Sequence, residues 1–331
     1  MKRLHISLLL CSLALLGSAL FSLCSCNTRI NRGEITDGVT SVYCDESFKN
    51  ILEQEINVFE YTYQNASLIP YYVDESTAID SLLDYKTKII VTAHKLKPEF
   101  EELLKVKKGY CRTQQIAVDA IALIINNDNP IDILSVGELK MILTGQIKEW
   151  RQIEPVKGLG DIKVVFDHKG SSTVKYMRDS LTCGKDFPQN VFAQGSSEAV
   201  IDAVMHNKNA IGIIGVSWIS SDMTVKGMSQ EERMQNLNTE NVTTTEFSSD
   251  VKVMKVRRDD SYQAFKPYQA YIYDGSYPLY RSIYAISTAP VGTLPQSFYC
   301  FITGVIGQKI MLQTGVMPSI MHPRIVEVSQ H

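Results

Sequence analysis

Beyond residue 26 the sequence lacks a hydrophobic run of membrane-spanning length, and it contains few cysteines. No stretch there approaches the roughly 20 consecutive apolar residues that a spanning helix needs. Four cysteines follow residue 26 and lie far apart: Cys44, Cys111, Cys183 and Cys300. They form no CxxC pair and have no histidine nearby at metal-binding spacing, which argues against a zinc site. We therefore expect no metal and no cofactor, and we interpret these cysteines as independent positions, although an oxidising compartment would permit disulfides.

Positive charge is also in short supply. The chain has 33 Lys and Arg residues against 36 Asp and Glu residues, which gives a formal net charge of −3 at pH 7. This balance argues against nucleic acid or an anionic membrane surface as the main partner. The sequence has no internal repeat and no low-complexity tract. Its length suffices for two domains of ordinary size, each with its own core.

A nucleophile elbow of the GxSxG type is absent as well, which bears on a hydrolase interpretation. Asp167, His168 and Ser171 lie close together in the sequence and invite that interpretation. A catalytic triad needs a base that a third group orients, and an oxyanion hole that faces the nucleophile. Because neighbours on one short loop rarely converge in this way, we expect a binding protein rather than an enzyme.

The first 26 residues carry a strong targeting signal. A basic start at Met1-Lys2-Arg3 is followed by an apolar run from Ile6, which ends at Leu23-Cys24-Ser25-Cys26. A charged start, a short hydrophobic segment and a small residue before the cut are typical of a secretory signal peptide, here residues 1–25. The last four residues resemble the bacterial lipobox, which implies acylation of Cys26 and a lipid anchor in the bilayer. We expect a lipid-anchored protein outside the cytoplasmic membrane, in the periplasm or cell envelope; an ordinary signal peptide with incidental cysteines is the alternative.

Strand and helix patterns alternate after a polar tether, which we predict over residues 26–39. Short apolar segments predict strands, and amphipathic segments with helical spacing separate them. The predicted strands include Thr40–Cys44, Leu68–Val73, Lys88–Thr92, Ile116–Ile125, Val164–Phe166, Ala210–Val216, Tyr268–Tyr273 and Ile283–Ile286. This alternation indicates an α/β fold with a parallel sheet. Residues 219–250 are polar and aperiodic and indicate a surface excursion, and Phe298–Leu312 predicts a late helix.

Hydroxyl residues recur where a predicted strand gives way to a helix, at Ser47, at Ser76-Thr77 and at Ser171-Ser172-Thr173. A helix N-terminus leaves backbone N–H groups unpaired and carries a partial positive charge. Several such junctions would form a neutral, hydrogen-bonding anion site if they converged at the carboxyl ends of the strands. For any single junction, plain N-capping is the better explanation, because serine and threonine are preferred there anyway.

Several segments, in order along the chain, resemble those of phosphate-type solute-binding proteins of ABC transporters. Residues 124–150 contain Asn129-Pro130 and end in Glu149-Trp150, as does a segment of that family. Gly170–Thr173 is similar to the family's GSGT phosphate loop, and Ala210–Ile214 is similar to one of its strands. The resemblance covers, with gaps, residues 41–320. It implies the type II periplasmic binding protein fold, an α/β fold of two lobes with the ligand cleft between them.

The same resemblance implies domain limits and a function. Lobe 1 would comprise residues 40–114 and 262–331, and lobe 2 would comprise residues 115–261. The protein would be a monomer that captures a small oxyanion, in first place inorganic phosphate, and delivers it to an ABC transporter permease. The alternatives are a different ligand, or a sensing or adhesion partner without transport.

Carried over residue by residue, the resemblance implies a ligand site of hydroxyl residues and one aromatic residue: Ser47, Phe48, Ser76, Ser171, Ser172 and Thr173. Two positions depart from the family. Asp167 stands where the family has an arginine, and His94 lies nearest to the position of an aspartate that accepts the proton of hydrogen phosphate. With an acid in place of the arginine and a histidine in place of the aspartate, the charge of the site either stays roughly balanced or indicates a different ligand. We expect the affinity for phosphate to fall as pH rises, because His94 loses its proton or because the ligand gains charge near Asp167.

Overall fold

The computed structural model describes residues 35–220 and 246–320, together with Ser229, Glu231, Glu232, Gln235 and Leu237. The predicted signal peptide, Cys26, most of the predicted tether and most of the predicted surface excursion lie outside the described residues. The described residues from Thr36 onward belong to one compact unit. Within the described part, no helix combines the length and the apolar character that a membrane span requires.

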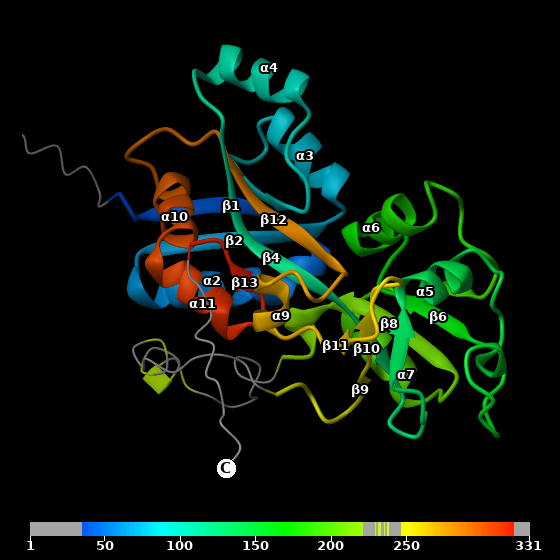
Figure 1. Cartoon of the computed structure of the whole chain (residues 1–331). Helices are drawn as coiled ribbons and strands as arrows, with labels where there is room; N and C mark the ends of the chain where they lie inside the picture. The colour runs from blue at the N-terminus through cyan, green and yellow to red at the C-terminus, as the bar shows by residue number, and fades with distance from the viewer. Residues whose placement is uncertain are drawn as a thin grey trace, which may run out of the picture. The chain divides into compact units, whose positions relative to one another are not determined.

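Strands and helices alternate through the compact unit, as Figure 1 shows. The strands are β1 Gly38–Asp45, β2 Ala66–Val73, β3 Ile89–Thr92, β4 Arg112–Ile125, β5 Ile133–Ser135, β6 Lys163–Phe166, β7 Val191–Ala193, β8 Ala210–Gly215, β9 Lys252–Val253, β10 Lys255–Arg257, β11 Ala264–Phe265, β12 Tyr280–Ser287 and β13 Met317–Pro318. The helices are α2 Lys49–Thr62, α3 Glu75–Leu83, α4 Pro98–Lys108, α5 Val136–Leu143, α6 Ser172–Leu181, α7 Ser197–Met205, α9 Gln269–Tyr273, α10 Leu294–Thr303 and α11 Val305–Gln313. Short 3-10 helices are η1 Glu46–Phe48, η2 Trp150–Gln152 and η3 Val216–Trp218.

The main sheet is mixed rather than wholly parallel. Its strands are hydrogen-bonded in the order β2-β1-β3-β12-β4-β8-β6-β7, with β9 and β13 pairing with β4 off this path. The predicted parallel pairing is confirmed for β1 with β2 and β3, and for β6 with β7 and β8. β12 and β4 run antiparallel to their neighbours. A small separate sheet has the order β11-β10-β5.

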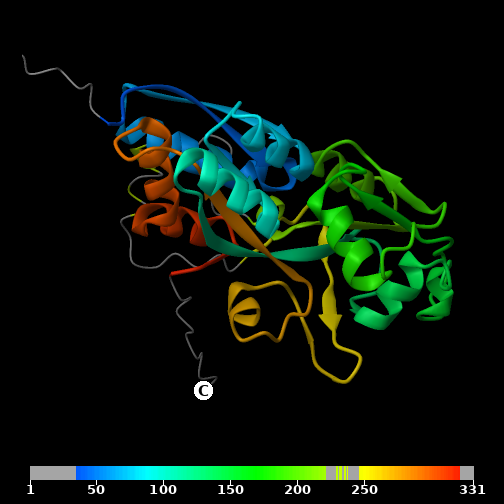
Figure 2. The same cartoon turned by 90° about the horizontal axis from the view of Figure 1, so that it is seen from above.

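β4 links two groups of strands. It is 14 residues long, and its first part, Arg112–Ala120, pairs with β12. Its second part, Ile121–Ile125, pairs with β8. The second part is completely buried, which explains why it is a continuous apolar run in the sequence. Figures 1 and 2 both show the green helices α5, α6 and α7 gathered around β6 and β8, beside the group that contains β1, β3 and β12.

Helices cover both faces of the strand group that contains β1, β3 and β12. Successive side chains of a strand point to opposite faces, so each face packs against its own helices. On β3, Ile90 packs in one cluster with Leu82 of α3 and Leu104 of α4. Its neighbour Val91 belongs to the main core, which also contains Phe59 of α2. Each such fully buried side chain contributes about 1.5–3 kcal/mol relative to an exposed one. Burial on both faces fixes β1 and β3, and with them the strand ends where the candidate site lies.

One predicted strand is a helix in the structure. The segment Tyr268–Tyr273 alternates in the way that strands do, but α9 occupies it. Gln269 Nε2 donates to the carbonyl oxygens of Leu312 and Val316, at 2.6 and 2.8 Å. These hydrogen bonds hold the turn of α9 against the end of α11, so tertiary contacts override the local alternation.

Two element boundaries also differ from the prediction. The late helix predicted over Phe298–Leu312 is divided into α10 and α11 at Gly304, whose backbone is extended. A Cβ atom on Gly307 would lie 2.6 Å from the backbone of Ile302, so the two helices pack too closely for a larger residue there. At the other end of the chain, β1 begins at Gly38, within the predicted tether.

Candidate ligand-binding site

Two helix N-termini place serine and threonine hydroxyl groups at the ends of strands. η1 follows β1 directly, and the Oδ1 atom of Asp45 accepts a hydrogen bond from the backbone N–H of Ser47 at 3.0 Å. α6 begins shortly after β6, and the Oγ atom of its N-cap Ser171 accepts a hydrogen bond from the backbone N–H of Val174 at 3.1 Å. Such caps form because a side-chain oxygen satisfies an N–H group that the first helical turn leaves free.

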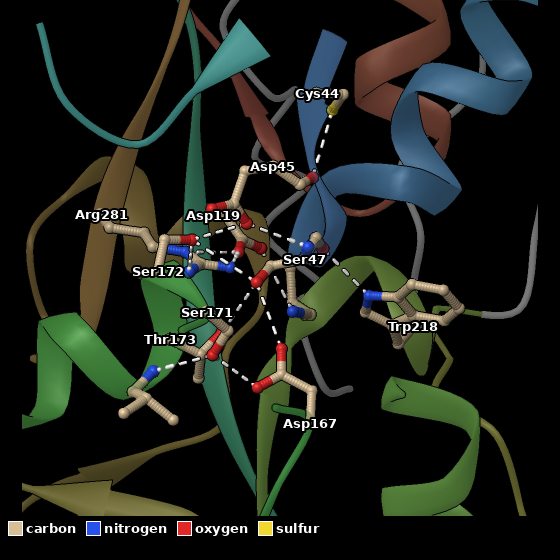
Figure 3. Close-up of polar contacts among 12 residues, drawn as sticks. Cys44, Asp45, Ser47, Asp119, Asp167, Ser171, Ser172, Thr173, Trp218 and Arg281 are labelled. Carbon is tan, nitrogen blue, oxygen red and sulfur yellow. Dashed lines mark hydrogen bonds and ion pairs between the residues drawn. The ribbon is translucent and has the colours of Figure 1, made fainter. Parts of the chain in front are cut away.

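The two helix ends meet, although 125 residues separate Ser47 from Ser172 in the sequence. The hydroxyl oxygens of Ser172 and Thr173 each lie 3.4 Å from the Oγ atom of Ser47 (Figure 3). Ser171, Ser172 and Thr173 are 0% exposed, and Ser47 is 1% exposed. We call Ser47, Ser171, Ser172 and Thr173 the hydroxyl cluster. The structure therefore brings together four of the side chains that the sequence suggested for the ligand.

Asp167 accepts hydrogen bonds from the hydroxyl cluster and has no cation beside it among the described contacts. Its Oδ1 atom accepts from the hydroxyl of Ser171 at 2.6 Å and from the backbone N–H of His168 at 2.9 Å. Its Oδ2 atom accepts from the hydroxyl of Ser47 at 3.2 Å. The side chain is buried, so water does little to screen its charge. Each oxygen of this carboxylate therefore accepts a hydrogen bond from a hydroxyl group of the cluster.

Asp45 lies on the other side of the cluster and is only partly satisfied. Its Oδ1 atom accepts from the Ser172 hydroxyl at 2.9 Å, in addition to the Ser47 N–H. Its Oδ2 atom is buried and has no hydrogen-bond partner among the described residues. Burial raises the pKa of Asp45, and the positive charge of Arg281 and the Ser47 hydrogen bond oppose that rise. The site thus contains a buried acceptor without a donor.

A buried ion pair lies next to the hydroxyl cluster, between Arg281 on β12 and Asp119 on β4. Arg281 donates through Nε and Nη2 to the Oδ2 atom of Asp119, at 3.2 and 3.0 Å, and through Nη1 to the Ser172 hydroxyl at 2.6 Å (Figure 3). The guanidinium carbon lies 4.5 Å from the centre of the Phe48 ring, which is fully buried. Burial raises the pKa of Asp119, and Arg281 opposes that rise. The charge of Arg281 is therefore matched by Asp119 before any ligand is considered.

Asp45, Asp119 and Arg281 are site residues that the sequence pattern does not point to. Asp119 interrupts the long apolar run of β4, and a charge inside a buried strand is costly unless it is paired. That signal predicts a partner of opposite charge, but it does not say which residue. Pairing across β4 and β12 depends on strand register, which the sequence alone does not reveal.

Four of the predicted site residues lie outside the hydroxyl cluster: Asp167 contacts it, Phe48 contacts Arg281 beside it, and Ser76 and His94 have no described contact with it. Ser76 is the second residue of α3 and is exposed, and in the described part of the chain its hydroxyl does not join the cluster. His94 is about half exposed and faces Glu75, with its backbone N–H 2.8 Å and its Nδ1 atom 3.0 Å from a carboxylate oxygen. Burial raises the pKa of Glu75, but the hydrogen bond and charge of His94 outweigh it and the net shift is downward. The described contact of His94 is therefore with the carboxylate of Glu75.

The residues that invited a hydrolase interpretation do not form a triad. The ring of His168 points its Nε2 atom at Glu46, 3.2 Å away, and its Nδ1 atom at Asp74, 3.3 Å away. The contacts with Glu46 and Asp74 are ion pairs only when the ring is protonated. Neither contact is a hydrogen bond. Ser171 instead donates to Asp167 and caps α6. Among the described contacts, the His168 ring therefore faces Glu46 and Asp74 and not the Ser171 hydroxyl.

Neither a metal site nor a disulfide occurs in the described part of the chain. No group of three or more His, Cys, Asp and Glu side chains is placed to hold a metal ion there. Cys44, Cys111, Cys183 and Cys300 are all free thiols. Burial raises the pKa of the Cys44 thiol well above its usual range, which keeps it uncharged beside the site.

Comparison with known proteins places the chain in a family. A family model described as a PBP superfamily domain matches residues 33–304. The phosphate-binding protein PstS of Pseudomonas aeruginosa is 21% identical over 300 residues, which cover 86% of this chain and 84% of that protein.

Solved structures share the fold. One from Clostridium perfringens, which carries the name of a phosphate ABC transporter substrate-binding protein with bound phosphate, aligns at a TM-score of 0.63 and 22% identity. The alignment covers 85% of this chain and 99% of that one. An ABC-type phosphate transport receptor from Vibrio cholerae aligns at a TM-score of 0.60 and 17% identity, covering 84% and 99% of the two chains. The predicted α/β fold of the type II periplasmic binding proteins is confirmed, and the chain belongs to the PBP superfamily.

Proposed function

We propose that the protein is an extracytoplasmic solute-binding receptor that captures inorganic phosphate and delivers it to an ABC transporter permease. The observation that carries this proposal is the convergence of Ser47 with Ser171, Ser172 and Thr173, a buried set of neutral donors suited to a small oxyanion. The names of the relatives in Pseudomonas aeruginosa and Vibrio cholerae point to the same ligand. These relatives are named as a phosphate-binding protein and a phosphate transport receptor, so we propose binding without chemistry on the ligand.

Binding would redirect hydrogen bonds that already exist. The hydroxyls of Ser47 and Ser171 would turn from Asp167 to the oxygens of the ligand, and the first-turn amides of α6 would face the same oxygens. Hydrogen bonds to a charged group contribute about 1.5–3 kcal/mol each. Arg281 would remain with Asp119 and would position the Ser172 hydroxyl through its Nη1 atom.

We propose that two lobes close over the ligand, with lobe 1 formed by residues 40–114 and 262–331 and lobe 2 by residues 115–261. Ser47 would then contact the ligand from lobe 1, and Ser171 from lobe 2. Contacts from both lobes favour the closed state, and β4 would absorb the motion. Small-angle scattering should show a smaller radius of gyration with phosphate than without it. An unchanged radius would contradict the closure.

We also propose that acylated Cys26 anchors a monomeric receptor to the bilayer. The support is the lipobox-like sequence that ends the apolar run. Labelled palmitate should enter the wild-type protein and the Cys24→Ala variant, and it should not enter Cys26→Ala. Labelling of Cys26→Ala would show that another residue carries the lipid.

Calorimetry with the purified protein tests the ligand. Phosphate should bind with saturable heat and a stoichiometry of about one, and it should raise the melting temperature as ligands of the folded state do. Chloride at equal ionic strength is the control. Absence of phosphate binding at both pH 6 and pH 8 would rule out this ligand and leave the fold assignment intact.

A further inference from the structure

One face of β1 and β2 carries apolar and aromatic side chains that the described helices leave exposed. In the parallel register of these strands, Tyr43 lies beside Tyr71, and their rings stack with centres 4.6 Å apart. α3 and α4 pack on the face to which Tyr43 points, on the same side of the sheet in Figure 1. Alternate residues of a strand share a face, so Val39 and Ile69 also lie on this one. The side chains of Val39, Ile69 and Tyr71 are 68, 45 and 44% exposed, and we call them the apolar strip.

Exposed lysines border the apolar strip. Lys86 follows α3 and lies against β1, where its carbonyl oxygen accepts a hydrogen bond from the Ser41 hydroxyl at 3.2 Å. At the end of α4, the Nζ atoms of Lys108 and Lys107 lie 3.9 and 6.0 Å from the centre of the Tyr85 ring. We call Lys86, Lys107 and Lys108 the lysine cluster; all three are exposed. Positive charge therefore gathers beside the apolar strip, around one aromatic ring.

The Tyr85 ring is kept there at a conformational cost. Tyr85 has a φ angle of 61°, and the backbone N–H of Lys86 after it donates to the carbonyl oxygen of Ser81 at 2.9 Å. Glycine usually takes this left-handed position at a helix end, and a bulky residue rarely adopts it. The end of α3 thus gives no reason for an aromatic side chain, which is 41% exposed. Strain of this kind is typical of positions that serve an interaction.

The chemistry of this face fits the surface of an anionic bilayer. Tyrosine rings favour the level of the lipid headgroups, apolar side chains enter the boundary below them, and lysines are attracted to anionic lipids. The helix dipole explains lysines in the last turn of α4, but it explains neither Lys86 nor the apolar strip. A second copy of the chain fits less well, because a twofold contact would bring two lysine clusters together. Pro70 also removes an N–H group from the edge strand β2, which disfavours the addition of another strand.

The proposed lipid anchor brings a bilayer close to the same face. β1 is the first described strand, and it begins at Gly38. Cys26 precedes Gly38 by about a dozen residues, and a fully extended chain of that length spans at most about 40 Å. Val39 is the next residue of β1 and belongs to the apolar strip. A membrane contact here would be secondary to the anchor, in agreement with the acidic balance of the whole chain.

We propose that the apolar strip and the lysine cluster form a docking face that rests on the anionic headgroup surface of the bilayer. This inference rests on the proposed function through its lipid anchor. The acyl chains would hold the protein at the membrane, and the docking face would set its orientation. Val39 and Asp45 lie near opposite ends of β1, roughly 20 Å apart at about 3.3 Å per residue. Docking would therefore hold the hydroxyl cluster at a constant distance from the bilayer that contains the permease.

The acylated protein, reconstituted in vesicles, tests the docking face. The vesicles consist of phosphatidylcholine alone or of phosphatidylcholine mixed with anionic phosphatidylglycerol. On the mixed vesicles, an amine-reactive reagent should modify the lysine cluster at least about fivefold more slowly, and the amides of β2 should exchange more slowly with deuterated solvent. Added salt should reverse both effects, because it screens the lysines. The internal controls are exposed lysines elsewhere in the fold, which should react equally on both vesicles: Lys148, Lys157 and Lys185.

A triple variant removes the charge of the face. Changing the three residues of the lysine cluster to glutamine should weaken docking by up to roughly 100-fold, because each lysine near an anionic surface contributes about fivefold. The slower exchange of the β2 amides on mixed vesicles should then disappear. The matched control changes Lys148, Lys157 and Lys185 to glutamine, which alters the net charge equally, and it should behave as the wild type does. Phosphate binding should be unchanged in both triple variants, because none of these lysines belongs to the hydroxyl cluster.

A second variant tests the apolar strip. Val39→Thr combined with Ile69→Thr keeps the branched shape that suits a strand and makes both side chains more polar. It should weaken docking on mixed vesicles severalfold, with an unchanged thermal transition. Ile133→Thr is the control, since Ile133 is 44% exposed on the separate strand β5, and it should dock as the wild type does.

The outcomes separate this inference from the proposed function. Equal lysine reactivity and equal β2 exchange on the two kinds of vesicle would overturn the docking face and leave phosphate capture and the anchor intact. Protection that arises only when a permease is added would assign the face to a protein partner and would overturn it as well. A wild-type protein that floats with neither kind of vesicle would overturn the anchor and this inference together. A protein that docks as expected but does not bind phosphate would contradict the proposed function alone.

Discussion

The buried carboxylates of Asp119 and Asp167 lie close together in the fold but are satisfied in different ways. Asp119 faces a guanidinium and accepts two hydrogen bonds from it. Asp167 faces hydroxyl and backbone donors, none of which carries a charge. Asp119 has its counterion without a ligand, whereas Asp167 has only neutral donors among its described contacts.

This difference separates a structural pair from a site that responds to a ligand. Removing one member of a buried ion pair leaves an uncompensated charge, so such a pair is difficult to change without loss of stability. Hydroxyl donors are neutral and can turn toward another acceptor, so their bonds can be exchanged. We therefore expect variants of the Arg281 pair to lose stability, and variants of the hydroxyl cluster to lose ligand affinity.

The largest effect should come from Arg281→Met. Methionine keeps much of the apolar volume but leaves Asp119 buried without a cation, so unfolding in urea should show a loss of about 3–5 kcal/mol. Arg151→Met is the matched control, because Arg151 is exposed and pairs with Glu149 at the surface, where a pair is worth about 0–1 kcal/mol. Equal losses of unfolding free energy in the two variants would show that the buried pair contributes no more to stability than a surface pair does.

The second effect should appear in binding. Ser171→Ala combined with Thr173→Val should weaken phosphate binding at least about tenfold, because hydrogen bonds to a charged ligand contribute about 1.5–3 kcal/mol each. Loss of the Ser171 cap should also lower stability by about 1 kcal/mol. Ser180→Ala, on an exposed part of the same helix, is the control and should bind as the wild type does. Full affinity in the double variant would show that the cluster does not contact the ligand.

The third effect concerns stability at high pH. The pKa of Asp45 is raised in the folded state, so its contribution to stability is fully present below its ordinary pKa and is lost as pH rises through the raised value. Asp45→Asn should therefore be more stable than the wild type at pH 8 by about 1 kcal/mol, and this advantage should vanish near pH 4. Urea titrations at the two pH values measure it. A constant difference at both values would contradict the buried, unbalanced charge.

The smallest effect, of opposite sign, should come from Glu75→Gln. The pKa of Glu75 is lowered in the folded state, so its contribution to stability is present above its ordinary pKa and is lost as pH falls through the lowered value. The wild type should exceed the variant in stability at pH 6 by at most about 1 kcal/mol, because His94 is half exposed and solvent screens the pair. The difference should disappear near pH 3. A variant more stable than the wild type at pH 6 would show that His94 does not stabilise the carboxylate.

The sequence allowed prediction of those parts of the site that depend on local structure. Ser47 and Ser171 occupy caps or first turns of helices after strands, and such positions can be read from residue type and periodicity. The pairing of Asp119 with Arg281 could not be predicted, because it depends on the register between β4 and β12. The α9 segment was misassigned for a similar reason, since its contacts are with the distant end of α11. Contacts between residues far apart in the sequence are therefore the part of the structure that a local pattern does not predict.

The shared strand β4 has a consequence for how the protein unfolds. Because Arg112–Ala120 pairs with β12 and Ile121–Ile125 pairs with β8, opening either group of strands removes hydrogen bonds from the strand that supports the other. Heat or urea should therefore melt the compact unit in a single cooperative transition. The amide protons of Ile121–Ile125 would then exchange with deuterated solvent only when the whole unit opens, which makes them reporters of its global stability.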